Sequence, residues 1–178
     1  MILNQEKTLF LIVDIQEKLL NAVFNKEVLK NKSVILTKVA RILDIPVVIT
    51  EQYPKGLGNT VEEIKSNIFN ATYFEKTDFN ALTDDCLYKL LKDKEQIVIM
   101  GIEAHICVYQ TAMALLNEKF SVTVVKDACG SRQESEYENA LEVLEKNGAQ
   151  IKTAEMIIFE LLKSAKHPNF KEIQTLIK

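Results

Sequence analysis

Residues 96–113, QIVIMGIEAHICVYQTAM, decide how the rest of the chain is interpreted. The stretch begins with an apolar run at 97–100, which is typical of a buried strand, and Gly101 ends that run. Apolar residues at helical spacing follow. Cys107 therefore lies in the first turns of a helix, where the positive end of the helix dipole favours a thiolate. A buried structural cysteine is the alternative interpretation of the same pattern.

The overall composition is typical of one globular domain. The chain has 178 residues, of which 47% are hydrophobic and 26% charged, so we treat 1–178 as a single domain with a substantial core. The net charge of −3, with both signs interspersed, argues against a nucleic-acid partner. No apolar run approaches the ~18–20 residues that span a bilayer. We also see no signal peptide, and therefore expect a cytoplasmic protein without a membrane partner.

Cysteine and histidine content limits the kinds of site that the chain can form. Cys86, Cys107 and Cys129 are odd in number and far apart, which indicates a reducing compartment rather than a disulfide framework. With only His105 and His167, we expect no histidine-based metal site. His105 is not expected to activate Cys107, because residues two apart on a helix do not face each other; a capping or core role is expected instead. Neither GxGxxG nor GxxxxGK[ST] occurs, so no cofactor is expected.

Segments with strand and helix patterns alternate along the chain. Strands are expected at 8–13, 45–50, 72–75, 97–100, 121–125 and 150–153. Further helices are expected at 28–43, 60–70, 80–93 or 83–93, 134–147, 154–165 and 168–177, the second of them opened by a capping box at 60–63. Residues 51–59, EQYPKGLGN, are expected to form a loop. This alternation predicts the α/β class, with a parallel sheet covered by helices on both faces.

Five side chains suited to chemistry follow the predicted strands. They are Asp14, Tyr53, Lys76, Cys107 and Arg132. In a parallel sheet, ligands bind beyond the carboxyl ends of the strands. One edge of the sheet is therefore expected to collect a carboxylate, an ammonium, a thiol and a guanidinium, and this combination favours a nucleophilic role for the cysteine.

Several motifs resemble those of the isochorismatase-like cysteine hydrolases. They are LFLIVDIQ, FEKTDF, MGIEAHICVYQTA, VVKDACGSR and TAEMIIFELL, in this order over nearly the whole chain, and the TEQYPKGLG loop resembles the isochorismatase domain-containing branch. The resemblance implies a Rossmann-like three-layer αβα sandwich with a six-stranded parallel sheet of order 3-2-1-4-5-6. It also implies a homo-oligomer and an Asp–Lys–Cys triad, carried here by Asp14, Lys76 and Cys107.

The activity implied by the resemblance is hydrolysis of an amide, carbamoyl or ester bond of a small molecule through a cysteine thioester. Asp14 would accept the thiol proton, while Lys76 would keep Asp14 ionised and stabilise the thiolate. The resemblance also places a cis peptide before Glu103, so that the Glu103 and Cys107 amides would form an oxyanion hole. Because Cys107 alone combines a helix N-terminus with a nearby lysine, we expect it to be alkylated before Cys86 or Cys129.

Two departures from the patterns of the superfamily narrow this activity. Its metal-dependent nicotinamidases carry an Asp/His cluster after the second strand, whereas residues 51–54 here are EQYP, so that activity and a metal are not expected. Its true isochorismatases have a residue other than cysteine where Cys107 stands, so vinyl-ether cleavage is not expected either.

Four further side chains are candidates for substrate binding. Tyr53, Phe79 and Tyr109 could form an apolar wall, and Arg132 could bind a carboxylate; a structural role is the alternative for each. Two other functions stay open for the same fold. One is a binding or scaffold module with a residual triad, and the other is a redox-sensing thiol at Cys107.

Overall fold

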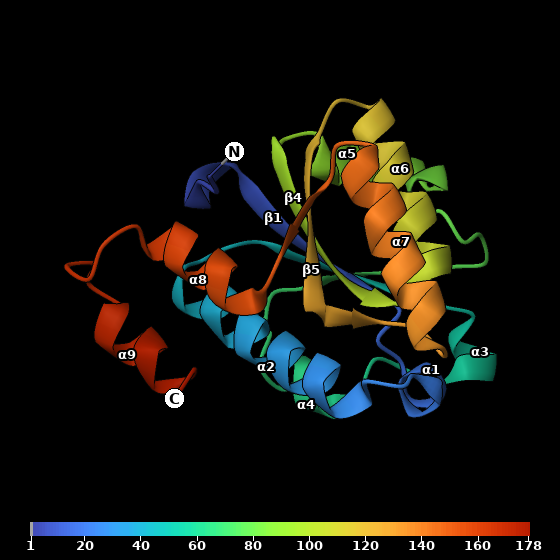
Figure 1. Ribbon diagram of the computed structural model, residues 1–178, viewed down its shortest axis with the longest axis horizontal. Helices are drawn as coiled ribbons and strands as arrows, with labels where there is room; N and C mark the ends of the chain where they lie inside the picture. Colours follow the sequence, from blue (N-terminus) through green and yellow to red (C-terminus); the bar gives the residue numbers. More distant parts are fainter. Residues whose placement is uncertain (1) are drawn as a thin grey trace.

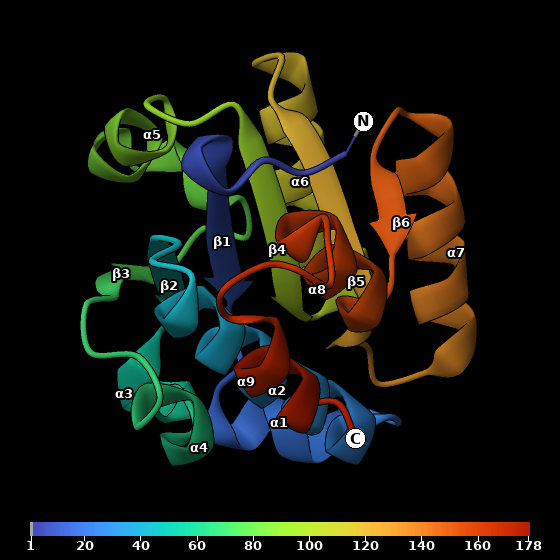
Figure 2. The same cartoon turned by 90° about the vertical axis from the view of Figure 1, so that its left-hand side faces the viewer.

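The computed structural model describes residues 2–178, and its centre is one six-stranded sheet. The strand order is β3-β2-β1-β4-β5-β6, and every neighbouring pair is parallel (Figure 2). The strands are β1 (Thr8–Val13), β2 (Val47–Gln52), β3 (Thr72–Lys76), β4 (Gln96–Ile102), β5 (Ser121–Gly130) and β6 (Gln150–Lys152). The expected order 3-2-1-4-5-6 is confirmed.

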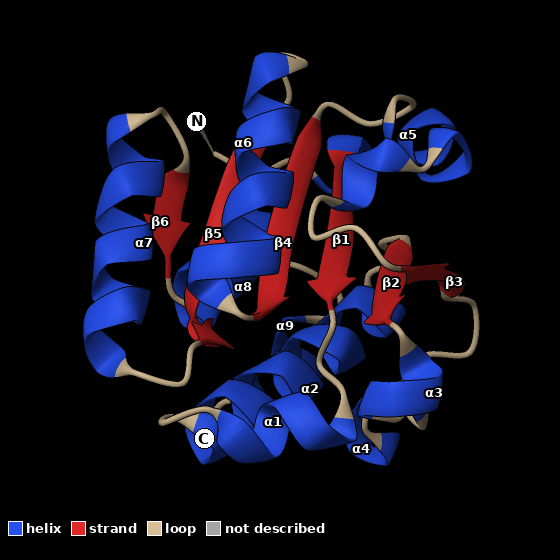
Figure 3. Cartoon of the chain, turned by 90° about the vertical axis from the view of Figure 1, so that its right-hand side faces the viewer, coloured by secondary structure: helices blue, strands red, loops and turns tan. Residues whose placement is uncertain are grey.

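Helices cover both faces of this sheet, which makes three layers (Figure 1). One face is covered by α2 (Lys26–Ile42), α8 (Ala154–Leu162) and α9 (Phe170–Thr175), and the other by α5 (Asp85–Leu91), α6 (Tyr109–Asn117) and α7 (Glu134–Lys146). Figure 3 shows the strands pointing toward the end of the molecule where α1 (Glu17–Ala22), α3 (Pro54–Leu57) and α4 (Glu62–Lys65) lie. Within residues 2–178, no helix is long and apolar enough to cross a membrane.

Strand β1 shows why the strands appear in the sequence as continuous apolar runs. Phe10 and Ile12 pack into the core under α2 and α8, whereas Leu9, Leu11 and Val13 pack into the core under α5, α6 and α7. Successive side chains of a strand point to opposite faces, and here both faces are covered. Each fully buried side chain of this size contributes roughly 1.5–3 kcal/mol to folding.

Gly101 allows β1 and β4 to lie close together at their carboxyl ends. It pairs with Val13 and has φ +154°. A Cβ atom on Gly101 would lie 2.1 Å from the backbone oxygen of Val13, which is far inside van der Waals contact. The glycine therefore brings Asp14, the residue after Val13, beside the turn that follows β4.

Several strands are longer at their carboxyl ends than the local pattern predicts. Strand β2, expected at 45–50, continues to Gln52, β4, expected at 97–100, continues to Ile102, and β5, expected at 121–125, continues to Gly130. The added residues pair with distant strands, as Gln52 does with Lys76 and Gly130 does with Ile102. Pairing of this kind has no local sequence signal, because it depends on the neighbouring strand.

The predicted capping box at 60–63 is wrong. The backbone N–H and the hydroxyl of Thr60 both donate to Glu51 Oε1, at 2.6 and 2.7 Å, so Thr60 does not cap a helix. Helix α4 is a single short turn, Glu62–Lys65, with Val61 before it. The reason is that the nearly buried Glu51 carboxylate requires hydrogen-bond donors, and Thr60 supplies two. The predicted loop at 51–59 likewise contains the short helix α3.

Candidate active site

Asp14, Lys76 and Cys107 come together where β1, β3 and β4 end. Lys76 Nζ lies 2.6 Å from Asp14 Oδ2, although the two residues are 62 positions apart in the chain. The Cys107 thiol forms side-chain interactions with both of them. The three residues of the expected triad therefore form one contiguous cluster.

The Asp14 carboxylate is completely buried and is satisfied at both oxygens. Thr50 Oγ1 donates to Oδ1 at 2.7 Å, and Lys76 Nζ donates to Oδ2. Asp14 adopts a left-handed backbone conformation, with φ 53°, directly after β1, while its N–H donates to the Thr50 carbonyl at 3.1 Å. An ammonium and a hydroxyl supply the compensation that a buried carboxylate requires.

The Lys76 ammonium donates three hydrogen bonds, which matches its three N–H groups. The acceptors are Asp14 Oδ2 at 2.6 Å, Gln52 Oε1 at 2.7 Å and the Asp78 carbonyl at 3.2 Å. Only 6% of the Lys76 side chain is exposed. Gln52 was not singled out in the sequence, where nothing in its local pattern distinguishes it from any other polar residue at the end of a strand.

Cys107 lies in a π-helical turn, Ala104–Val108, directly before α6. The pKa of its thiol is raised from 9.0 to about 12; burial is the largest cause, the Asp14 charge also raises this pKa, and the Lys76 charge lowers it. Lys76 therefore favours the thiolate, as expected, but burial and Asp14 outweigh it in the free site. The raised pKa and the exposure of Cys86 argue against the expected preferential alkylation of Cys107, which stays untested.

The turn between β4 and Cys107 begins with the expected cis peptide bond, between Ile102 and Glu103. The Glu103 carbonyl accepts from the N–H groups of Ile106 and Val108, at 3.0 and 3.2 Å. These bonds tie the turn that carries Cys107 to the end of β4. The use of the Glu103 and Cys107 amides as an oxyanion hole stays a prediction.

A second set of contacts joins this turn to the segment after β5. Arg132 Nε donates to Glu103 Oε1 at 2.7 Å, and His105 Nδ1 lies 2.9 Å from Ser131 Oγ. His105 thus interacts with Ser131, in line with a structural role. A substrate carboxylate would meet only the other two guanidinium nitrogens of Arg132, and that role stays a prediction.

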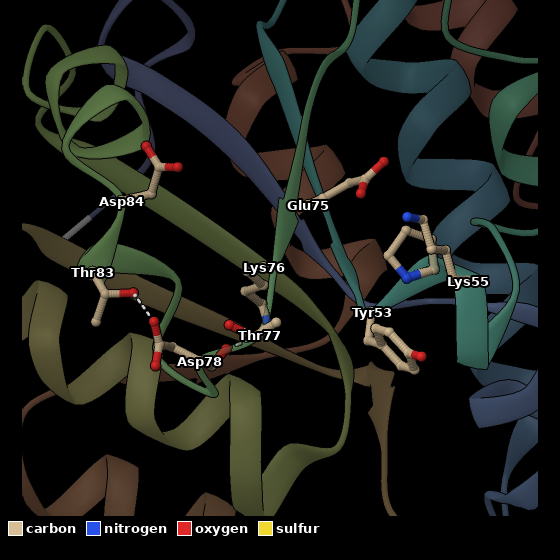
Figure 4. A pocket seen from close by; sticks show the side chains of 9 residues that line it. Tyr53, Lys55, Glu75, Lys76, Thr77, Asp78, Thr83 and Asp84 are labelled. Atoms are coloured by element: carbon tan, nitrogen blue, oxygen red, sulfur yellow. Dashed lines mark hydrogen bonds between the residues drawn. The ribbon is translucent and has the colours of Figure 1, made fainter.

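A cavity of about 440 Å³ lies beside Lys76. It is lined by Tyr53, Pro54, Lys55, Glu75, Lys76, Thr77, Asp78, Thr83 and Asp84. Figure 4 shows Asp78, Thr83 and Asp84 on one side of Lys76, and Tyr53 with Lys55 on the other. Thr83 Oγ1 donates to Asp78 Oδ2 at 3.2 Å. The side chains that line the cavity are therefore largely charged, whereas an apolar wall was predicted.

The three aromatic candidates lie in different surroundings. Tyr53 is 57% exposed and lines the cavity, so its place agrees with the prediction. Phe79 is 52% exposed and is not part of that lining. Tyr109 is half-buried and packs against the core under α5, α6 and α7. The structure places only Tyr53 of these three at the cavity wall.

The described residues contain no cluster suited to a metal ion. Within residues 2–178, no group of three or more His, Cys, Asp or Glu side chains is close enough to hold one. Glu51, at the place where related nicotinamidases would need ligands, accepts instead from Thr60.

Comparison with known proteins identifies the family. Residues 8–156 match the family model of the isochorismatase domain. The chain belongs to the isochorismatase family. It is 39% identical over 180 residues to isochorismatase family protein 1A of Dictyostelium discoideum, covering 98% of this chain and 87% of that protein. It is 37% identical over 177 residues to isochorismatase domain-containing protein 2 of Danio rerio, covering 98% and 89%. Family membership supports a hydrolase function.

Several solved structures of similar proteins superpose closely on this chain. One is described as MAR1 ribonuclease from Caenorhabditis elegans, with 37% identity, a TM-score of 0.96, and coverage of 99% of this chain and 92% of that chain. YcaC from Pseudomonas aeruginosa, solved with hexane-2,5-diol and covalent acrylamide, has 27% identity and a TM-score of 0.93, covering 98% and 91%. YcaC from Escherichia coli, described as an octameric hydrolase of unknown specificity, has 26% identity and a TM-score of 0.89, covering 98% and 95%.

Proposed function

We propose that this protein hydrolyses an amide, carbamoyl or ester bond of a small molecule through a thioester on Cys107. The observation that carries the proposal is the buried Asp14–Lys76 ion pair, 2.6 Å long, in contact with a buried thiol. A protonated thiol becomes a nucleophile only when a base removes its proton, and Asp14 is the carboxylate that interacts with it. A cysteine that served only as a core residue would not require this arrangement.

The first half of the reaction forms the thioester. Asp14 takes the proton from the Cys107 thiol while the sulfur attacks the carbonyl carbon, and the carbonyl oxygen becomes an oxyanion. The Glu103 and Cys107 amides are the proposed donors to that oxyanion. When the intermediate collapses, the bond to the amine or alcohol breaks, and the leaving group takes the proton from Asp14.

The second half of the reaction releases the acid and restores the thiol. Asp14 takes a proton from a water molecule, whose oxygen attacks the thioester carbon. The carbon–sulfur bond then breaks, and the departing sulfur recovers the proton from Asp14. Lys76 remains an ammonium throughout, and its positive charge stabilises the negative charge that passes between Asp14 and Cys107.

The chemistry recorded for a neighbour supports a small, amide-sized ligand. The Pseudomonas aeruginosa structure contains acrylamide attached covalently. The cavity beside Lys76 in this chain, about 440 Å³, also fits a small molecule. The charged residues around it, Lys55, Asp78 and Asp84, indicate a polar substrate.

Ribonuclease activity is the second candidate, because the Caenorhabditis elegans neighbour is described by that name. RNA binding depends on positive surface charge, whereas this chain has a net charge of −3. Glu75, Asp78 and Asp84 also place carboxylates around the cavity, where a phosphate backbone would be repelled. Redox sensing is less well supported, since only 6% of Cys107 is exposed.

The decisive experiment is a substrate screen with matched variants. Amides, carbamoyl compounds, esters and a single-stranded RNA would be incubated with the wild type, Cys107→Ala, Asp14→Asn and the control Cys86→Ala. We expect turnover of an acyl compound by the wild type and the control alone, with an acyl mass on Cys107 in quenched samples. Equal turnover by Cys107→Ala, or cleavage of RNA alone, would overturn the proposal.

We also propose that the protein is a homo-oligomer, as the octameric Escherichia coli neighbour is. In α8, Ile157 and Leu161 are buried in the core of this chain. Met156 and Phe159 of α8 are instead 51% and 43% exposed, and they would suit a contact between copies. Light scattering at micromolar concentration should give the mass of a dimer or larger assembly; a monomer mass would refute this.

A further inference from the structure

The ion pair between Asp14 and Lys76 reaches across the end of strand β2. Asp14 follows β1 and Lys76 ends β3, and β2 lies between these strands. Because neighbouring strands are about 4.8 Å apart, β1 and β3 are separated by roughly 10 Å. The Lys76 side chain must therefore extend across β2 to reach Asp14 at 2.6 Å.

Strand β2 supplies one neutral hydrogen-bond partner to each charged residue of this pair. Thr50 Oγ1 donates to Asp14 Oδ1 at 2.7 Å, and Gln52 Oε1 accepts from Lys76 Nζ at 2.7 Å. Thr50 and Gln52 are two positions apart, so they point to the same face of the strand. Gln52 is also the residue that pairs with Lys76 in the sheet register.

The Gln52 side chain is held in one orientation. Its Nε2 donates to the Thr77 carbonyl at 2.7 Å, which directs Oε1 toward Lys76. A rotation of the amide would place its N–H groups against an ammonium, which has no acceptor. The backbone of Gln52 is held as well, because its N–H donates to Gln16 Oε1 at 2.7 Å.

Gln16 is completely buried and connects the ends of β1 and β2. Its Nε2 donates to the Gln52 carbonyl at 3.0 Å and to the Gly58 carbonyl at 2.6 Å. Its N–H donates to the Asp14 carbonyl at 2.8 Å. Gln16 therefore links the segment that carries Asp14 to the residue that holds Lys76.

We propose that Gln52, fixed by Gln16, is a positioning residue that holds the Lys76 ammonium on Asp14 and within reach of Cys107. The inference rests on the proposed cysteine hydrolysis. A glutamine provides an acceptor without adding charge. A carboxylate at the same place would give Lys76 a second anion and would oppose ionisation of the Cys107 thiol.

The test measures the rate of Cys107 alkylation by iodoacetamide as a function of pH, followed by mass spectrometry in the Cys86→Ala background. Gln52→Met removes the acceptor at similar size, and Gln52→Glu retains an acceptor but adds a charge. Gln174→Met, in α9, is the matched control, and Lys76→Met is the reference for complete loss of the ammonium. Other titratable or charged groups lie on the neighbouring segments, and all variants retain them: Asp14, Tyr53, Lys55, Glu75, Asp78, Asp84, Glu103, His105 and Arg132.

We expect Gln52→Met to slow alkylation by about tenfold near neutral pH, the size expected for losing a hydrogen bond to a charged group. Both Gln52 variants should displace the pH profile upward by about one unit, and Lys76→Met by at least as much. Gln174→Met should match the wild type. A purely structural role for Gln52 would lower the melting temperature without displacing the pH profile.

The inference is overturned if Lys76→Met displaces the profile but both Gln52 variants retain that of the wild type. If Lys76→Met also retains the wild-type pH profile, the Lys76 charge does not act on Cys107. The inference then fails, and so does the role given to Lys76 in the proposed function. Should Gln52→Met fail to fold, Gln52→Ala removes the same acceptor without adding a charge and carries the same comparison.

Discussion

Removing the ammonium of the buried ion pair tests whether Asp14 and Lys76 depend on each other. In Lys76→Met, Asp14 would retain the Thr50 hydroxyl as partner but would lose the only cation that contacts it in residues 2–178. The carboxylate is completely buried, and the Lys76 side chain is 6% exposed, so little solvent can replace the ammonium. The substitution should therefore cost much more than the loss of a surface ion pair.

The expected cost follows from this burial. Breaking a buried ion pair by removing one partner destabilises a protein by about 3–5 kcal/mol. At about 2–4 °C per kcal/mol for a domain of this size, the melting temperature should fall by roughly 6–20 °C. The double variant Asp14→Asn/Lys76→Met removes both charges of the pair and should recover most of this loss.

Urea unfolding followed by circular dichroism measures these free energies, and the chain offers a matched control. Lys7 forms a similar contact with Glu95, 2.8 Å long, but their side chains are 50% and 67% exposed. Lys7→Met should cost at most about 1 kcal/mol. If Lys76→Met costs no more than Lys7→Met, or if the double variant is less stable than Lys76→Met, the argument from buried charge is refuted.

Three further predictions follow from thiol burial and backbone packing. Exposed Cys86 should react with iodoacetamide before Cys107 near neutral pH, and mass spectrometry showing the reverse order would contradict the raised pKa of Cys107. The free energy of unfolding should decrease as pH rises from about 9 to about 12, because burial raises the pKa of Cys107 and of Cys129 to about 12, so the folded state keeps protons that the unfolded state releases. Urea unfolding at several pH values checks this, and a free energy that stays constant over that range would contradict it. Gly101→Ala should prevent folding or sharply lower the melting temperature, because the added Cβ would lie 2.1 Å from the backbone oxygen of Val13. A melting temperature near that of the wild type would contradict this, since it would show that β1 and β4 can separate at little cost.

Local patterns in the chain predicted the architecture and a set of candidate site residues. Apolar runs separated by amphipathic segments predict a parallel sheet covered on both faces, because each strand must be buried on both sides. Asp14, Lys76 and Cys107 were among five candidates because each follows or ends such a run, and parallel strands end at one edge of the sheet. The likeness to a family pattern then singled out these three and gave the strand order.

The protonation state and the supporting contacts of the site depend on residues that are distant in the chain. The assembled core and Asp14 raise the pKa of the Cys107 thiol, an effect that a helix-terminus argument from neighbouring residues does not include. Gln52 and Lys76 are 24 positions apart, and Arg132 and Glu103 are 29 apart. Hydrogen bonds across such separations form only after the strands are aligned, so no spacing rule along the chain could assign them.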